Sequence, residues 1–171
     1  MSPAKILYQR LKANGLDFFT SVPCMLLGDL ISLLERDREV TYTPVTREEE
    51  GIGILAGACL GGRRPAIIMQ NSGLGNSINA LCSLVGLYRL PIVMILSHRG
   101  SEGERIDAQM PMGRATEKLL RSIEVPFRVI RNTGEIDLAD RVIAEGFKKK
   151  RPVALLFPHS YWIKEKADDQ V

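Results

Sequence analysis

The chain has 171 residues, a formal net charge of +3 and a hydrophobic content of 45%. This length and composition are typical of one globular domain, here expected over residues 1–171. Aromatic residues make up only 6% of the chain and the basic excess is small, which argues against a nucleic-acid-binding protein.

The three cysteines, Cys24, Cys59 and Cys82, are widely spaced, and no CxxC pattern or Cys/His cluster occurs. We therefore expect no metal site of the zinc type, and thiols that stay reduced. The start of the chain does not resemble a signal peptide, and no apolar run approaches the roughly 18 residues of a membrane span. These features predict a cytoplasmic protein.

Strand patterns and helix patterns alternate along the whole chain. Strands are expected at 17–22, 40–45, 65–69, 91–96, 126–130 and 152–157, and helices at 3–14, 23–35, 76–88, 113–123 and 135–150. A further helix follows Thr46, which would cap it with Glu49 as the capping-box partner. This alternation predicts an α/β fold, a three-layer sandwich around a mostly parallel six-stranded sheet.

In parallel sheets of this kind ligands bind at the carboxyl ends of the strands. The segments expected there are 21–24, 45–48, 70–76 and 97–113. Three of these four segments contain unusual polar residues, which makes this edge the predicted site.

The segment from Gln70 to Asn76 combines amides and hydroxyls with two glycines and carries no charge. A turn that only reversed the chain would need fewer polar groups, so this one is suited to a small polar ligand. Gly73-Leu74-Gly75 could cradle a phosphate, but Ile78 interrupts the dinucleotide-binding spacing. A nucleotide-binding, flavodoxin-like domain is therefore a distant alternative.

Three glutamates, Glu48 to Glu50, open the helix after Thr46. The helix dipole alone favours acids there. Glu48 falls near the side of Ile52 and Leu55, so its carboxylate would be partly buried and available for proton transfer. Both interpretations stay open on this pattern.

The long segment 97–113 is too polar to pack by itself, so it is either functional or a solvated loop. His98 and Arg99 follow a strand directly and could hold an anionic substrate. Cys24 lies between a strand and a helix, where a reactive thiol and a packed one are both possible.

Residues 45–84, and above all the string MQNSGLGN at 69–76, closely resemble the pyrimidine-binding (Pyr) domain of thiamine-diphosphate-dependent 2-oxoacid decarboxylases. Within that superfamily the similarity is greatest to sulfopyruvate decarboxylase alpha subunits, and next to phosphonopyruvate decarboxylases. The resemblance implies thiamine diphosphate and Mg²⁺ as cofactors. It extends in weaker form over nearly the whole chain.

In the family one glutamate lies nine residues before the glycine of an AxG helix, and counting back from Gly57 gives Glu48. The resemblance implies that Glu48 is catalytic and hydrogen-bonds N1′ of the cofactor's aminopyrimidine. The other residues implied to bind the cofactor are Val22, Pro23, Gln70, Asn71, Gly73 and Asn76. Those expected to bind the substrate are His98, Arg99 and Gln109.

Two positions depart from related pyruvate decarboxylases. Cys24-Met25 and Gln109-Met110 stand where those enzymes carry an acid and histidines, so proton transfer to the product would need another donor. The GDG motif that holds magnesium and the diphosphate is also absent from the chain. The resemblance therefore implies a partner beta subunit carrying the diphosphate-binding (PP) domain, and a hetero-oligomer that is active only when assembled.

The expected reaction converts 3-sulfopyruvate to sulfoacetaldehyde and CO₂, a step of coenzyme M biosynthesis in methanogens. Sulfonate and phosphonate are similar in shape, so a phosphonopyruvate decarboxylase subunit is one alternative. A non-catalytic regulatory Pyr-like module is the other.

Overall fold

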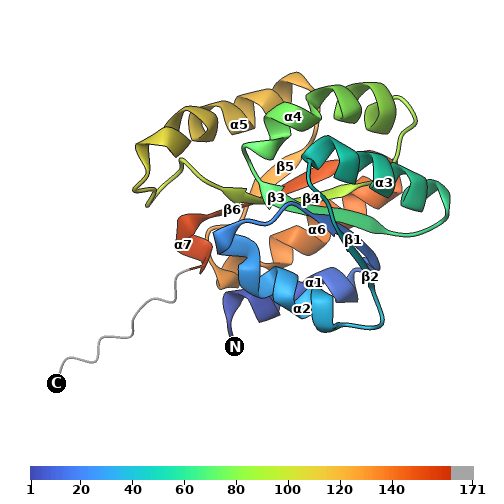
Figure 1. Cartoon of the computed structure of the whole chain (residues 1–171), viewed down its shortest axis with the longest axis horizontal. Coiled ribbons are helices and arrows are strands. Elements are labelled where there is room, and N and C mark those ends of the chain that lie inside the picture. Colours follow the sequence, from blue (N-terminus) through green and yellow to red (C-terminus); the bar gives the residue numbers. More distant parts are fainter. Residues whose placement is uncertain (163–171) are drawn as a thin grey trace.

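The computed structural model of the chain describes residues 1–162 (Figure 1). Residues 163–171 of the expected domain lie outside this description. Six parallel strands form one sheet in the order β2-β1-β3-β4-β6-β5. The strands are β1 (Phe18–Ser21), β2 (Thr41–Pro44), β3 (Pro65–Gln70), β4 (Val93–His98), β5 (Phe127–Val129) and β6 (Val153–Pro158).

Helices cover both faces of the sheet (Figure 1). One face packs against α1 (Pro3–Ala13), α2 (Gly28–Arg36), α6 (Asp137–Lys149) and the short α7 (His159–Trp162). The other packs against α3 (Glu48–Leu60), α4 (Gly73–Ala80) and α5 (Met110–Ser122). The three-layer α/β sandwich with a six-stranded sheet is thereby confirmed, and its sheet is parallel throughout.

Burial on both faces explains why the central strands have continuous apolar sequences. Every residue of β4 and of β6 is buried, as is all of β3 except Gln70. Strands covered on both faces do not need the polar alternation of a half-exposed strand.

Helix starts differ from the expected ones. The helix expected at 23–35 begins with a 3₁₀ turn, η1 (Met25–Leu27), before α2. The helix expected at 76–88 begins earlier, as α4, and continues as a π-helix, η2 (Leu81–Gly86). The predicted capping box was wrong: Arg47, not Thr46, is the N-cap of α3. Thr46 donates from its N–H and its hydroxyl to Glu50 Oε2, not to Glu49.

The strand order changes direction between β1 and β3. The chain moves outward from β1 to β2, then returns past β1 to β3 and continues the other way. Ligand crevices of open α/β sheets form at such switch points. Within residues 1–162, no helix combines the length and apolar character that a bilayer crossing requires.

Candidate functional site

The four segments predicted to share an edge do so. Strands β2, β1, β3 and β4 are neighbours and parallel, so the segments after them meet at one edge of the sheet. The last of these segments, 97–113, contains η3 (Asp107–Gln109) and the first residues of α5. The long 97–113 segment is therefore partly ordered into helix.

Glu48 begins α3 and lies directly on the first residue of α4. A Cβ built on Gly73 would stand 2.6 Å from both Cδ and Oε1 of Glu48, so only glycine allows this approach. Asn76, one turn along α4, donates from Nδ2 to Glu48 Oε2 at 3.0 Å. Within residues 1–162 the Glu48 side chain makes this one hydrogen bond, which leaves its Oε1 without a partner. Glu48 is half-buried, as its place on the helix predicts.

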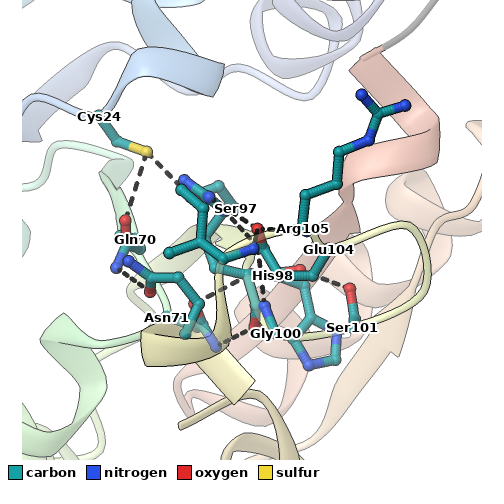
Figure 2. Close-up of polar contacts among 12 residues, drawn as sticks. Cys24, Gln70, Asn71, Ser97, His98, Gly100, Ser101, Glu104 and Arg105 are labelled. Carbon is teal, nitrogen blue, oxygen red and sulfur yellow. Dashed lines mark hydrogen bonds and ion pairs between the residues drawn. The ribbon is translucent and has the colours of Figure 1, made fainter.

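A second group of uncharged side chains continues from there across the edge (Figure 2). Gln70 Nε2 donates to Ser72 Oγ at 2.7 Å and to Gln109 Oε1 at 3.0 Å. Cys24 Sγ lies 3.8 Å from Gln70 Oε1 and 3.3 Å from Ser97 Oγ. These contacts join the loops after β1, β3 and β4, and they place Cys24 at the switch point. Sequence reasoning singled out Cys24 but gave no sign that Ser97 would meet it.

Asn71 does not face the crevice. It is fully buried, accepts from Arg99 N at 3.0 Å and donates from Nδ2 to Arg99 O at 3.0 Å and Thr116 Oγ1 at 2.8 Å. The amide thus ties the end of β3 to the segment after β4 and to α5.

Arg99 forms a buried ion pair that the sequence did not reveal. Its Nε and Nη2 donate to Glu104 at 2.6 and 2.9 Å, and the two side chains are only 8% and 3% exposed. Glu104 also accepts from the backbone N–H groups of Gly100, Arg105 and Ile106. The Arg99 guanidinium, together with these N–H groups, holds the pKa of Glu104 well below its usual range. Glu104 in turn raises the pKa of Arg99, as does the nearby Cys24.

Two glycines close the base of this loop. Gly100 has φ +69°, and a Cβ on it would collide with the backbone of Gln109; a Cβ on Gly113 would collide with Gly100. His98, just before, is 5% exposed, with Nε2 3.4 Å from Gly113 O. Burial lowers the pKa of His98, which favours the neutral imidazole.

The predicted site residues therefore fall into two groups. Glu48, Gly73, Asn76, Gln70 and Gln109 come together at the open edge. The others lie around or beneath it: Val22, half-buried, bonds Ile68 O; Pro23 is exposed; Asn71, His98 and Arg99 are buried.

Comparison with solved structures identifies the fold. A 2-oxoglutarate:ferredoxin oxidoreductase from Magnetococcus marinus superimposes with a TM-score of 0.72, over 95% of this chain and 30% of that one, at 14% identity. A scan against protein-family models finds no match.

Sequence relatives are more specific. The sulfopyruvate decarboxylase subunit alpha of Methanothermobacter thermautotrophicus is 46% identical over 160 residues, which are 93% of this chain and 97% of the relative. A sulfopyruvate decarboxylase of Methanosarcina acetivorans is 33% identical, and a phosphonopyruvate decarboxylase of Streptomyces hygroscopicus is 34% identical. Each match spans more than nine-tenths of this chain but only 41% and 40% of those longer proteins.

The relatives thus define a protein of the 2-oxoacid decarboxylase class. Within that class the chain belongs to the family of sulfopyruvate decarboxylase alpha subunits.

Proposed function

We propose that this chain is the alpha subunit of a thiamine-diphosphate-dependent enzyme that converts 3-sulfopyruvate to sulfoacetaldehyde and CO₂. In this proposal the reaction serves coenzyme M biosynthesis in a methanogen. The observation that carries it is the half-buried Glu48 carboxylate packed on Gly73, in a chain that matches a named alpha subunit over 93% of its length.

The residues present fit the aminopyrimidine of thiamine diphosphate. That ring is flat and uncharged, with nitrogen acceptors and an amino donor. The edge offers it the Oε1 of Glu48, which has no hydrogen-bond partner, and the amides of Gln70 and Asn76, whose own hydrogen bonds involve no cation. The missing side chain of Gly73 makes room for the Glu48 carboxylate at this edge.

In the working enzyme Glu48 would share a proton with N1′ of the aminopyrimidine. Asn76 would hold the carboxylate in place through Oε2 and leave Oε1 toward the ring. Val22 and Pro23 would border the same ring from the loop after β1, and Asn71 would fix the β3 loop from behind. When bound, thiamine diphosphate supplies the nucleophilic carbon and accepts the electrons released as CO₂ leaves.

Substrate recognition would fall to the neighbouring groups. Gln109 and Gln70 would donate to the carboxylate or sulfonate of the substrate. Arg99 would contribute its charge from the side of Cys24, with Glu104 fixing its orientation. His98, neutral and enclosed, would support the loop that carries Gln109.

A partner beta subunit would complete the site. The outer side of α3 carries exposed Gly53 and Gly57, where an added Cβ would meet only open space. Leu60, Leu87 and Tyr88, at the ends of α3 and η2, are 73%, 69% and 65% exposed. Small groups along α3 and apolar groups at the ends of α3 and η2 suit helix packing by another chain. The longer relatives have more than half their length outside the match, which leaves room for a diphosphate-binding domain with its Mg²⁺.

We place the assembly in the cytoplasm. Cys24, Cys59 and Cys82 are all free thiols, as expected in a reducing compartment.

The test is CO₂ release from sulfopyruvate with thiamine diphosphate and Mg²⁺, for this chain alone and for the chain co-expressed with its partner. Activity is expected only in the pair. Glu48→Gln in the pair should lower kcat by at least about 100-fold, the usual scale of an acid–base group. Glu50→Gln, in the same exposed first turn, is the matched control and should leave kcat near wild type. Equal activity for Glu48→Gln and wild type would overturn the catalytic role.

Phosphonopyruvate is the second candidate substrate, favoured by the 34% identity to the Streptomyces decarboxylase. The same assay with both substrates decides between them. A kcat/KM at least tenfold higher for phosphonopyruvate would reassign the reaction. Silence on both, in a folded complex that binds the cofactor, would favour a regulatory module.

A further inference from the structure

A cavity of about 750 Å³ opens at the opposite edge of the sheet, where β4, β5 and β6 begin. Its walls come from η2, from the end of α5 and from the end of α6, and none of the residues discussed above for cofactor or substrate lines it. Its charged lining residues are Arg89, Glu124, Lys148, Lys149, Lys150 and Arg151.

The charge of this cavity is unusual for the chain. Five cations and one carboxylate give its lining a net charge of +4, whereas the whole chain carries +3. Glu145 pairs with Lys149 at 2.9 Å and with Arg151 at 2.5 Å. Among the ion pairs of residues 1–162 none involves Arg89, Lys148 or Lys150, and the Nε of Arg151 is buried without a hydrogen-bond partner. The lining therefore holds more donors than the chain itself satisfies.

The backbone conformation around this cavity is also unusual. Among the described residues, three that are not glycine have positive φ: Arg89 at +56°, Glu124 at +56° and Lys150 at +50°. All three line this cavity, and each follows the end of a helix. The corresponding residues after α1 and α3 are Gly15 and Gly62, at +73° and +82°.

Glycine adopts this conformation freely, whereas residues with a Cβ are strained in it. The chain thus uses glycine at two helix ends and charged side chains at the three that surround the cavity. Strained backbone is often found where a side chain has a function. The three strained positions therefore indicate a function for this cavity.

We propose that this cavity binds a small polyanion, a molecule with two or more phosphate or sulfonate groups, as an effector remote from Glu48. Arg89 and Arg151 offer planar forks that bind such groups through paired hydrogen bonds, and Lys148 and Lys150 add charge. The volume accommodates a ligand of nucleotide size. The inference does not rest on the proposed decarboxylase activity.

Cys82 gives the test a native reporter, because it is exposed and lines the cavity. The chain in complex with its partner is treated with iodoacetamide, and alkylation of each cysteine is followed by peptide mass spectrometry. Tripolyphosphate is the probe, against sodium chloride of equal ionic strength. We expect it to slow alkylation of Cys82 at least fivefold and saturably, with Cys24 and Cys59 unchanged. Titration calorimetry of the same complex gives an affinity that does not depend on the thiol.

The variant Arg89→Gly/Lys150→Gly removes two charges and also relieves the backbone at both positions, so it should fold at least as well as wild type. We expect it to weaken tripolyphosphate binding tenfold or more. Lys118→Ala, which removes an exposed charge from α5 outside the cavity, should leave binding unchanged. Equal binding by the double variant and wild type, or equal protection by sodium chloride, would overturn the proposal. So would binding of duplex DNA or anionic vesicles without any response to tripolyphosphate.

Discussion

Two carboxylates at the carboxyl edge of the sheet, Glu48 after β2 and Glu104 after β4, are held in opposite ways. At the start of α3, Glu48 makes one hydrogen bond and stays half-exposed. After β4, Glu104 accepts five hydrogen bonds and is 3% exposed. The first carboxylate keeps one oxygen without a hydrogen bond, as its proposed role requires, and the second has both oxygens engaged in holding a loop.

The comparison teaches that burial of an ionisable group does not by itself mark the reacting one. A carboxylate whose acceptor capacity is filled by a guanidinium and by backbone N–H groups has little left for a substrate. One that is held at a single oxygen keeps the other available. Variants of the two carboxylates should therefore differ: a change at Glu104 should lower stability most, and a change at the seat of Glu48 should lower activity most.

The largest expected effect is on the supporting side. Glu104→Gln leaves the Arg99 charge buried without its partner, which should lower the free energy of unfolding by about 3–5 kcal/mol. Glu102→Gln, exposed on the same loop, should stay within about 0.5 kcal/mol of wild type. Urea unfolding of the two variants measures the difference. Equal stability would mean that the ion pair contributes nothing net.

The same pair predicts a dependence on pH. The pKa of Glu104 is lowered in the folded chain, first by Arg99, so its contribution is complete above the unfolded pKa near 4.3 and is lost as pH falls. The stability gap between wild type and Glu104→Gln should therefore narrow by up to about 1.4 kcal/mol per pH unit below about pH 4. A gap that stays constant down to pH 3 would contradict this origin.

On the presenting side, Gly73→Ala places a methyl group against the Glu48 carboxylate and displaces it. In the assembled complex we expect kcat to fall by about 100-fold, on the scale of a lost acid–base group, with little change in unfolding temperature. Gly75→Ala is the matched control, because a Cβ there meets nothing within 4 Å. Full activity in both alanine variants would mean that catalysis does not depend on the contact of Glu48 with Gly73.

These two sides also differ in how well the sequence predicts them. The string around Gly73 and the acidic helix start point to one edge of a parallel sheet, because each signal is local and the strand pattern fixes where they meet. The hydrogen bonds of Asn71 to Arg99 and Thr116, and the ion pair of Arg99 with Glu104, leave no local pattern in the sequence. Both depend on how the 97–113 segment folds back on itself. Its composition shows many charges but does not show which of them pair. Gly100 and Gly113 could have indicated a close contact, yet nothing in their spacing says that they meet each other.

The smallest effect tests how firmly Glu48 must be held. Asn76→Ala removes one hydrogen bond to Oε2 at the protein surface, which is worth about 0.5–1.5 kcal/mol. We therefore expect kcat/KM in the complex to fall by about two- to tenfold. Asn79→Ala, one turn further along the same helix and bonded to Ser83, should remain within about twofold of wild type. A loss in Asn76→Ala as large as that of Glu48→Gln would mean that the amide itself contacts the cofactor, and that α4 presents two functional groups where the geometry of Gly73 alone suggests one.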